Sequence, residues 1–594
     1  MKHLTQHRPW HSLMAASLIP LLAFFLACGP GEQPTPTPVP TATAVATATP
    51  TAAPAATPTP TRPGPAATPT PTSVAPPTAT PTPGEQPKRG GRYLSMENFY
   101  PPDFDGHVTG SNTFGLVSGM AVLTANLHTN LFTSYEGDKV ECEICTDWRL
   151  EDGGKTMVFN MIQGIKFHSG REMTSADVAY TLKKLMGEID GVVSPRVGGI
   201  KEYITSIETP SRYQLKVRMV RPSLFVPKVL TFGFAGIYPE GTTRAMLKED
   251  PHGSGPFVLK ETITGASLKF DRNPNYFKQG LPYLDGFDLV IVGDATTRIA
   301  GFLTGRVLLT SLLAPQYMDQ LERLVAEGKM NTFVNVGGCG PHFVGWVNPK
   351  PPFTDKKVRQ AINLAIDRKA LGEFMYSRWA VPQLMFYGKG QDYATPEEKI
   401  WNVVPGWGTG AKKQQEIEEG KKLLADAGFP NGMDMEQMGS APFGNFGMAA
   451  SHEPVQAMLG KVGIRAKLIP VDSATQNTRM TNLDYQIQSW LFCTRTKDPD
   501  DVIGTYWITG ASRGWFGYSN PEVDRLFLQM SGELDPAKRK EVFFRIQDII
   551  VLDTVGYAPY SRSEDYLWWW KSFRGVTLSN VSGGVRFDRV WIDK

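Results

Sequence analysis

Residues 148–186, WRLEDGGKTMVFNMIQGIKFHSGREMTSADVAYTLKKLM, constrain the fold of this chain more than any other stretch. A turn is expected at 152–154, where glycines can take positive φ without steric cost. Residues 155–162 then alternate between two faces, with Met157 on one face and Val158 on the other, which predicts a half-buried strand. The sequence TSAD that begins at Thr174 is typical of the capped start of a helix. Local structure here is therefore turn, strand, turn and helix.

The same stretch closely resembles the fingerprint of the family 5 solute-binding proteins of ABC importers, which are receptors for oligopeptides, dipeptides, nickel chelates and some sugars. Other signatures of that family follow in order: YLSMENFYPPDFD at 93–105, the hairpin ITSIETPSRYQLKVRMVRP at 204–222, GSGPF at 253–257, RNPNYF at 272–277, GLPYLD at 280–285, PPFTDKKVRQAI at 351–362, KKLLADAGFPNG at 421–432 and YSNPEVD at 518–524. The resemblance covers nearly all of residues 88–594.

This resemblance implies an α/β, periplasmic-binding-protein-like fold of the large cluster, with two lobes, a ligand cleft between them and an inserted domain in lobe I. The length agrees, because the chain after residue 87 exceeds the ~250–300 residues at which one hydrophobic core stops growing. The expected domains are a signal peptide at 1–27, a linker at 28–87, lobe I at 88–112, 250–335 and 556–594, its inserted domain at 113–249, and lobe II at 336–555.

The amino terminus reads as a targeting segment. Basic residues precede an apolar run at 13–25 that is too short to span a bilayer comfortably, and the run ends in FLAC at Cys28. This ending resembles a bacterial lipobox, although Phe25 stands where Leu is preferred, so we expect Cys28 to be lipidated. Ordinary secretory cleavage and an uncleaved anchor are the alternatives.

The following residues, 29–87, consist almost entirely of Pro, Thr and Ala. Such a segment has too little apolar surface to offset the entropy of folding, and its prolines favour an extended polyproline II spacer. We expect it to hold a globular receptor away from a lipid-anchored end.

The balance of charge argues against nucleic acid as a partner. The chain contains 61 Lys and Arg and 58 Asp and Glu, which gives a formal net charge of +3. This mild value predicts neither a nucleic-acid footprint nor a basic membrane patch.

Three patterns suggest catalysis or metal binding. Residues 510–514 match G-x-S-x-G, but WFGYSNP follows and cannot begin the helix that a nucleophile elbow needs, so a turn is expected. Cys142 and Cys145 are spaced like a redox motif or half a zinc site, yet no second pair exists, which leaves a local disulfide or two thiols. Histidines such as His342 and His452 stand alone. We therefore predict no enzyme activity, no metal and no cofactor.

The resemblance places the ligand site around Trp490. In peptide receptors of the family an aspartate follows this tryptophan within three residues and pairs with the ligand's α-ammonium, but here that position lacks a carboxylate. Arg495 lies nearby and would favour a carboxylate, phosphate or other acceptor-rich ligand. Two alternatives remain open: Arg495 pairs with an aspartate on its own loop, or a shifted alignment makes Asp498 the amine partner.

Further ligand contacts are expected from both lobes, and Cys339 and Cys493 match two cysteines that form a disulfide in peptide-binding relatives. The expected contacts are Ser111 and Asn112 in the loop after the first strand of lobe I, the aromatic residues Trp346 and Tyr506, and Tyr560 and Arg562 near a cleft-facing tyrosine run of the relatives.

These features predict a monomeric receptor at the cell surface or in the periplasm, anchored to the membrane through lipid at Cys28. It would bind a peptide, or a peptide-like or anionic solute, and deliver it to an ABC permease by cleft closure. The alternative is a receptor-like sensor or chaperone lipoprotein without a dedicated importer.

Overall fold

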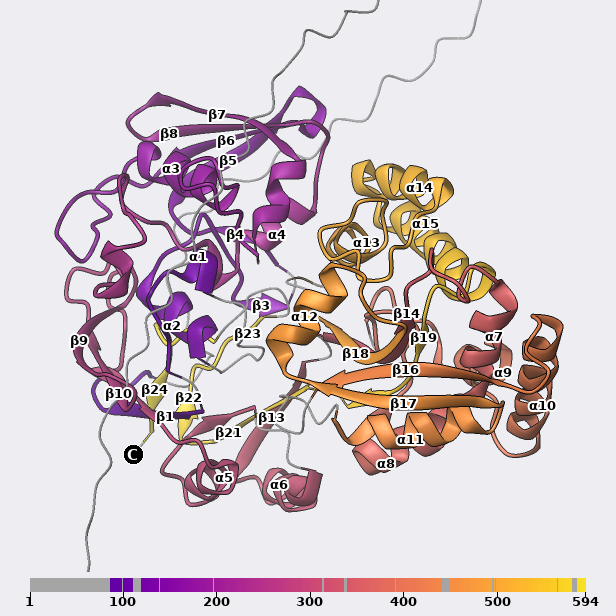
Figure 1. The fold of residues 1–594 in the computed structure, drawn as a ribbon. Helices are drawn as coiled ribbons and strands as arrows, with labels where there is room; N and C mark the ends of the chain where they lie inside the picture. Colours follow the sequence, from indigo (N-terminus) through magenta and orange to yellow (C-terminus); the bar gives the residue numbers. More distant parts are fainter. Residues whose placement is uncertain are drawn as a thin grey trace, which may run out of the picture. The chain divides into compact units, whose positions relative to one another are not determined.

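The computed structural model describes residues 86–593, apart from residues 99, 110–118, 138, 196, 312–314, 336–338, 390, 441–448, 494–495, 497, 564 and 580–584. The described residues belong to one unit, Pro69–Lys594 (Figure 1). The predicted signal peptide, Cys28 and nearly all of the Pro/Thr-rich tract lie outside the described residues. Among the helices that are described, none combines the length and apolar character needed to cross a membrane.

Three segments that are far apart in the sequence share one hydrophobic core. Strand β1 (Arg92–Glu97) pairs in parallel with β11 (Gly286–Ile291), and the sheet continues through β10 (Ser267–Arg272) to β9 (Phe257–Ile263). The ring of Phe287 in β11 stacks on Phe270 at 4.4 Å between centroids, and Phe587 packs edge-on against Phe287 at 5.5 Å. We use the name lobe I for the part of the chain that builds this core.

The stretch 148–186 forms the strands and helix that its sequence predicts. Strands β5 (Cys145–Glu151) and β6 (Thr156–Met161) are antiparallel neighbours, and the hairpin of β7 (Ile204–Ser211) and β8 (Gln214–Met219) completes a sheet in the order β5-β6-β8-β7. Helix α3 (Ser175–Leu185) covers this sheet. Its apolar residues belong to the same core as β1 and β11, so this domain is part of lobe I.

The start of α3 agrees with the sequence prediction, whereas the burial of β6 differs from it. Thr174 is the N-cap of α3, and its backbone N–H donates to Asp177 at 2.7 Å, as in the expected capping box. The strand, however, is buried on both faces: Val158, expected on the open face, is only 3% exposed. Val158 is in register with Arg149 and Lys216, whose long aliphatic stems can cover it.

Lobe II is built around a five-stranded sheet in the order β17-β16-β18-β14-β19. Its strands are β17 (Ile464–Val471), β16 (Met433–Ser440), β18 (Ile487–Cys493), β14 (Cys339–Trp346) and β19 (Ala558–Pro559). One face packs against α7 (Lys356–Ala365), α10 (Ala411–Asp426) and α11 (Ala449–Gly460). The other face belongs to a second, strongly aromatic cluster with α13 (Pro499–Tyr506), α14 (Pro521–Gly532) and α15 (Pro536–Asp548) (Figure 1).

Two stretches of lobe II predict helices from their sequence: Val358, Ile362, Ala365 and Ile366 fall on one helical face, and 421–432 is typical of a short helix stopped by Gly428 before Pro430. The apolar face expected for α7 is confirmed, since Val358, Ile362 and Ala365 are fully buried. The short helix expected within 421–432 is longer, because α10 already begins at Ala411. Its first half is mostly polar and gives little apolar periodicity, so the sequence did not reveal it; the stop near Gly428, at φ +94°, is confirmed.

The chain passes between the lobes at two neighbouring places. Strand β13 (Met330–Asn335) of lobe I leads into β14, and β20 (Arg562–Ser563) leads into β21 (Asp565–Trp570) of lobe I. β13 pairs with β21, and β14 pairs with β19, so the two connections are flanked by strands that are already hydrogen-bonded to each other. This arrangement is typical of a hinge.

The remaining helices and strands are short. They are α1 (Gly106–Thr109), α2 (Gly119–Leu127), α4 (Phe225–Val229), α5 (Ala295–Leu303), α6 (Met318–Ala326), α8 (Arg368–Tyr376), α9 (Glu397–Val403), α12 (Ser473–Thr481), β2 (Phe132–Thr133), β3 (Glu136–Gly137), β4 (Glu141–Cys142), β12 (Leu309–Thr310), β15 (Ala380–Val381), β22 (Phe573–Arg574), β23 (Leu578–Ser579) and β24 (Trp591–Ile592).

Candidate ligand-binding site

Trp490 lies on β18, one of the inner strands of the lobe II sheet. It is in register with Phe343 of β14, which is in turn in register with Pro559 of β19. The three residues therefore form a row across the sheet on its aromatic face. Phe343 is fully buried, whereas Trp490 is half-buried and packs against the aromatic cluster, so its ligand role stays a prediction.

The other predicted aromatic contacts are core residues in this structure. Trp346 is fully buried and packs parallel to Phe353, with centroids 6.5 Å apart. Tyr506 is fully buried and its ring lies edge-on to Phe492 at 4.9 Å. Both side chains are thus held by the hydrophobic clusters, and a ligand role for either of them stays a prediction.

Tyr560 lies on the sheet face opposite to Trp490, because its side chain belongs to the same cluster as Trp346. Its backbone N–H donates to the carbonyl of His342 at 2.7 Å, and the two rings meet edge-on at 5.7 Å. Burial raises the pKa of Tyr560, so the side chain is a neutral phenol at physiological pH. The structure therefore does not bring Tyr560 and Trp490 to one surface.

Several predicted residues cannot be placed. Arg495, Ser111 and Asn112 lie outside the described residues. Arg562 is in β20, whose backbone pairs with Val381 of β15, and its side chain is not among those described. The proposed charge of the site therefore stays a prediction.

A layer of buried polar groups near Tyr560 was not expected from the sequence. Tyr376 Oη and His342 Nδ1 are hydrogen-bonded at 2.9 Å, and Gln437 donates from Nε2 to the His452 carbonyl at 3.0 Å. Burial lowers the pKa of His452, which favours the neutral ring. The sequence could not reveal the hydrogen bonds of these histidines, because their partners come from separate strands and helices.

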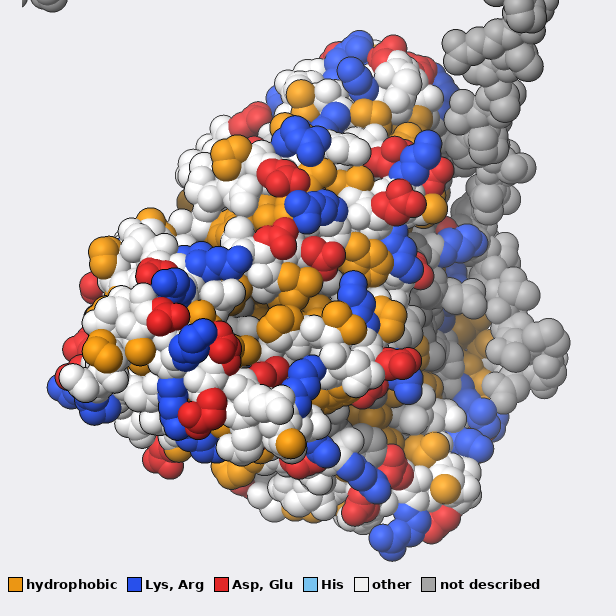
Figure 2. Space-filling model, turned by 90° about the vertical axis from the view of Figure 1, so that its right-hand side faces the viewer, with side chains coloured by type: hydrophobic (Ala, Val, Ile, Leu, Met, Phe, Trp, Pro, Cys, Tyr) orange, Lys and Arg blue, Asp and Glu red, His pale blue; other side chains and the backbone are white. Residues whose placement is uncertain are grey.

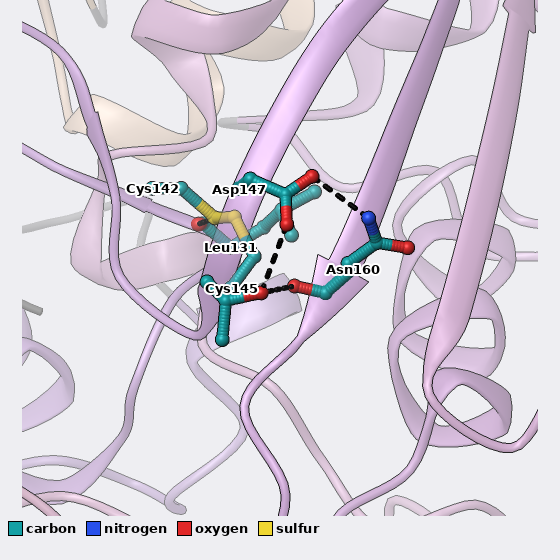
Figure 3. Close-up of a disulfide and its surroundings, with 6 residues drawn as sticks. Leu131, Cys142, Cys145, Asp147 and Asn160 are labelled. Carbon is teal, nitrogen blue, oxygen red and sulfur yellow. Dashed lines mark hydrogen bonds between the residues drawn. A yellow bond between two sulfur atoms is a disulfide. The ribbon is translucent and has the colours of Figure 1, made fainter. Parts of the chain in front are cut away.

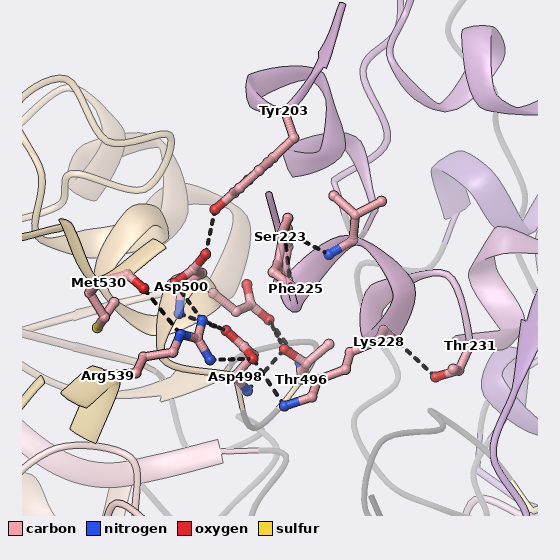
Figure 4. A network of polar contacts seen from close by, with 12 residues as sticks. Tyr203, Ser223, Phe225, Lys228, Thr231, Thr496, Asp498, Asp500, Met530 and Arg539 are labelled. Carbon is pink, nitrogen blue, oxygen red and sulfur yellow. Dashed lines mark hydrogen bonds and ion pairs between the residues drawn. The ribbon is translucent and has the colours of Figure 1, made fainter. Parts of the chain in front are cut away.

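Asp498, the alternative amine partner, is already engaged. It is the N-cap of α13, and its wholly buried carboxylate accepts two hydrogen bonds from Arg539 and one from Lys228 (Figure 4). These bonds occupy both carboxylate oxygens. The geometry therefore favours a structural role for Asp498 over contact with a ligand's α-ammonium.

The cysteine pair that resembled a redox motif forms a local disulfide. Cys142 in β4 and Cys145 in β5 are bonded, with Cα atoms 5.7 Å apart (Figure 3). Next to the bond, Asn160 Nδ2 donates to Asp147 Oδ1 at 2.7 Å and fixes the start of the β5–β6 pair. Of the two alternatives for these cysteines, the disulfide is the one that the structure contains.

The catalytic and metal-binding patterns have no support among the described side chains. Residues 510–514 belong to no helix or strand, and the next helix, α14, begins only at Pro521, so the G-x-S-x-G match lacks the helix that directly follows a nucleophile elbow. Within the described ranges, no group of three or more His, Cys, Asp or Glu is placed to hold a metal ion. On the face shown in Figure 2, basic and acidic side chains are interspersed, in keeping with the balanced charge of the sequence.

Comparison with known proteins agrees with this architecture. The family described as "Bacterial extracellular solute-binding proteins, family 5 Middle" matches residues 139–514, which is more than half of the chain. Heme-binding protein A of Haemophilus influenzae is 24% identical over 480 residues, covering 74% of this chain and 84% of that protein. The oligopeptide-binding protein AppA of Bacillus subtilis is 26% identical over 467 residues, covering 73% and 80%.

Solved structures show the same fold. Haemophilus influenzae OppA in complex with the peptide RPPGFSPFR superposes with a TM-score of 0.69 at 18% identity, covering 85% of this chain and 99% of that one. Helicobacter pylori DppA in complex with the peptide STSA gives 0.68 at 20% identity, with the same coverage. The fold is thus α/β and periplasmic-binding-protein-like, and the chain belongs to the family 5 bacterial extracellular solute-binding proteins.

Proposed function

We propose that this protein is an extracytoplasmic receptor that binds a small solute between its two lobes and delivers it to the permease of an ABC importer. The match to family 5 across a fold with two lobes and a paired-strand hinge is the observation that carries this proposal. A hinge of this kind lets two lobes close around a ligand and remove it from water.

The solute that we propose is a peptide, or a peptide-like or anionic compound. Relatives named for oligopeptides and structures solved with bound peptides support this class. The half-buried ring of Trp490 offers a stacking surface, and Arg495 would add a charged donor. Because Arg539 and Lys228 already occupy Asp498, a ligand rich in acceptors fits this chain better than one held mainly through its ammonium.

We further propose that the receptor is monomeric and stands on the outer side of the cell membrane, held by lipid at Cys28. The lipobox-like FLAC sequence and the Pro/Thr-rich tract after it support this arrangement. A tract of this composition provides reach, so the receptor could approach the permease while staying attached.

Calorimetric titration of short peptides, and of the same peptides with blocked amino termini, tests the proposed function. Trp490→Ala should weaken binding roughly 10- to 150-fold through lost stacking and burial, and Arg495→Ala should do the same through a lost charge-assisted hydrogen bond. Trp401→Ala is the matched control, because Trp401 is also half-buried but lies in α9. Wild-type affinity in both site variants would place the pocket elsewhere, and loss of binding on blocking the amino terminus would favour an amine-reading site.

A further inference from the structure

A buried polar cluster joins the two lobes away from the hinge strands. On the lobe II side it consists of Asp498 and Asp500 at the start of α13, Ser531 at the end of α14, and Arg539 in α15. On the lobe I side it consists of Tyr203, Arg221 and Lys228. None of these residues belongs to β13, β14, β19 or β21.

Four hydrogen bonds between described residues cross from one lobe to the other in this cluster, and Figure 4 shows the two that reach the aspartates. Lys228 Nζ donates to Asp498 Oδ2 at 3.0 Å, and Tyr203 Oη donates to Asp500 Oδ2 at 2.7 Å. Tyr203 Oη and Ser531 Oγ are 3.1 Å apart, and Arg221 Nε donates to Ser531 Oγ at 2.9 Å. Arg221 also lies over the Tyr203 ring, with its guanidinium carbon 4.3 Å from the centroid.

Among the described residues, cations from both lobes contact the two carboxylates of the cluster. On the lobe II side, Arg539 contacts both carboxylates, through Nη1 to Asp498 at 2.9 Å and through Nη2 to Asp500 at 2.7 Å. Two carboxylates therefore share this guanidinium, and Lys228 of lobe I places an ammonium group directly against Asp498. Removing Lys228 would take a cationic partner from Asp498 in a site where Asp498 is fully buried and Asp500 is 3% exposed.

The pKa values of the two aspartates are shifted in opposite directions. Burial alone would raise the pKa of Asp498, but the charges of Arg539 and Lys228 hold it below its usual range. For Asp500, burial and the neighbouring Asp498 outweigh Arg539, and its pKa is raised. The hydrogen bond that Tyr203 donates lowers the pKa of Asp500 and so partly offsets this rise.

We propose that this cluster is a closure clamp: Lys228 and Tyr203 of lobe I lock onto Asp498 and Asp500 of lobe II whenever the lobes close, with or without a solute between them. Opening at the hinge must break all four bonds and hydrate both carboxylates. The clamp therefore sets the fraction of closed, ligand-free receptor. Because apparent affinity depends on the population of the competent state, it also tunes solute binding from outside the ligand site.

A second contact between the lobes provides the matched control. Arg378, after α8, pairs with Asp319 at 2.6 Å and with Glu322 at 2.7 Å in α6 of lobe I. Here the Arg378 and Asp319 side chains are 59% and 78% exposed. Exposed pairs of this kind contribute little, whereas breaking a buried pair is costly, so the two contacts should respond differently to the same type of substitution.

Small-angle X-ray scattering on ligand-free, full-length protein tests the clamp, with retained solute removed by unfolding and refolding. The wild type should fit closed lobes, and Lys228→Met, Tyr203→Phe and the double variant should have larger radii of gyration, from a shift of roughly tenfold or more toward the open form. Arg378→Met should scatter like the wild type. Hydrogen exchange at the start of α13 should also become faster in the clamp variants only.

Circular dichroism melting separates opening from unfolding, because Lys228 is partly exposed and its loss should leave each lobe folded. Folded clamp variants that scatter like the wild type would overturn the proposal, as would a ligand-free wild type that fits separated lobes. Since no solute is present in this experiment, its failure would leave the proposed receptor function intact, and failure of peptide binding would not affect the clamp.

Discussion

Cys339 and Cys493 are backbone register partners in the antiparallel strands β14 and β18. Directly opposed residues in such strands have Cα atoms about 4.5–5.5 Å apart, which lies within the range that a disulfide can span. The backbone thus supports the bond that the family resemblance predicts, and the bond itself stays a prediction. Peptide mapping of protein exported under oxidising conditions should recover the two cysteine peptides as one linked species.

Loss of that bond should cost more stability than loss of the local one. The segment between Cys339 and Cys493 is long, so the chain-entropy relation gives an upper value of roughly 5 kcal/mol, compared with about 2 kcal/mol for the short Cys142–Cys145 loop. Thermal unfolding of Cys339→Ser and Cys142→Ser variants compares the two. Full alkylation of Cys339 and Cys493 in the oxidised native protein would contradict the prediction.

A second buried ion cluster should be essential for the stability of lobe I. Lys278 Nζ lies 2.7 Å from Glu143 Oε1, and Arg586 Nη2 lies 2.7 Å from the same oxygen. Because Glu143 is buried, Lys278→Met should lower the free energy of unfolding by about 3–5 kcal/mol.

Lys216→Met is the control for this cluster, since Lys216 pairs with the partly exposed Glu151 at 3.2 Å. It should cost no more than about 1 kcal/mol in urea unfolding. Equal losses in the two variants would show that burial of the Lys278 cluster adds nothing.

The stability of lobe I should fall as the pH drops below neutral. Burial, with a smaller contribution from the nearby charge of Lys184, lowers the pKa of His107 to about 3, and its Nε2–H donates to the Gly236 carbonyl at 2.8 Å. Between the unfolded pKa of ~6.5 and this folded value, the unfolded chain binds the extra proton, so stability present above pH 6.5 is progressively lost.

At pH 5 the loss from His107 alone should be about 2 kcal/mol relative to pH 7. His107→Gln keeps a donor for Gly236 and removes the titration, so its melting temperature should vary less with pH. A variant with the same pH profile as the wild type would show that His107 does not contribute.

The proposed lipid anchor at Cys28 can be tested by cell fractionation. A diacyl chain at Cys28 gives stable attachment because each buried CH₂ contributes about 0.8 kcal/mol. Cys28→Ala should therefore release the protein into the soluble fraction or leave the signal uncleaved. Unchanged membrane partitioning together with an unchanged mature amino terminus would refute the lipid assignment.

Local sequence patterns predicted much of this fold. The turn, strand and capped helix of 148–186 and the apolar face of α7 follow from spacings of a few residues, which short-range geometry translates directly into structure, whereas the 204–222 hairpin was predicted from the family resemblance. The family resemblance supplied the two-lobe architecture. The proposed domain bounds stay predictions, although the cores of lobe I and lobe II agree with a discontinuous first lobe.

The candidate site was less predictable from the sequence. The alternation of side chains along a strand assigns each residue to one of the two faces of the sheet, but it does not reveal what covers each face. Trp346 and Tyr560 look like ligand residues by type and position, yet they share a buried face opposite to Trp490. Asp498 looked like either a loop ion-pair partner or an amine acceptor. Its actual partners, Arg539 and Lys228, come from distant segments that no local pattern connects.

The most direct test of the central claim is native mass spectrometry of the gently purified mature receptor. A solute-binding protein of this kind should show a folded monomer that carries a discrete small-molecule mass, which disappears under denaturing conditions and is reduced in Trp490→Ala. We predict that the released mass corresponds to a peptide or to a peptide-like or anionic compound. A wild-type protein with no retained mass, which also fails to bind short peptides, would contradict it.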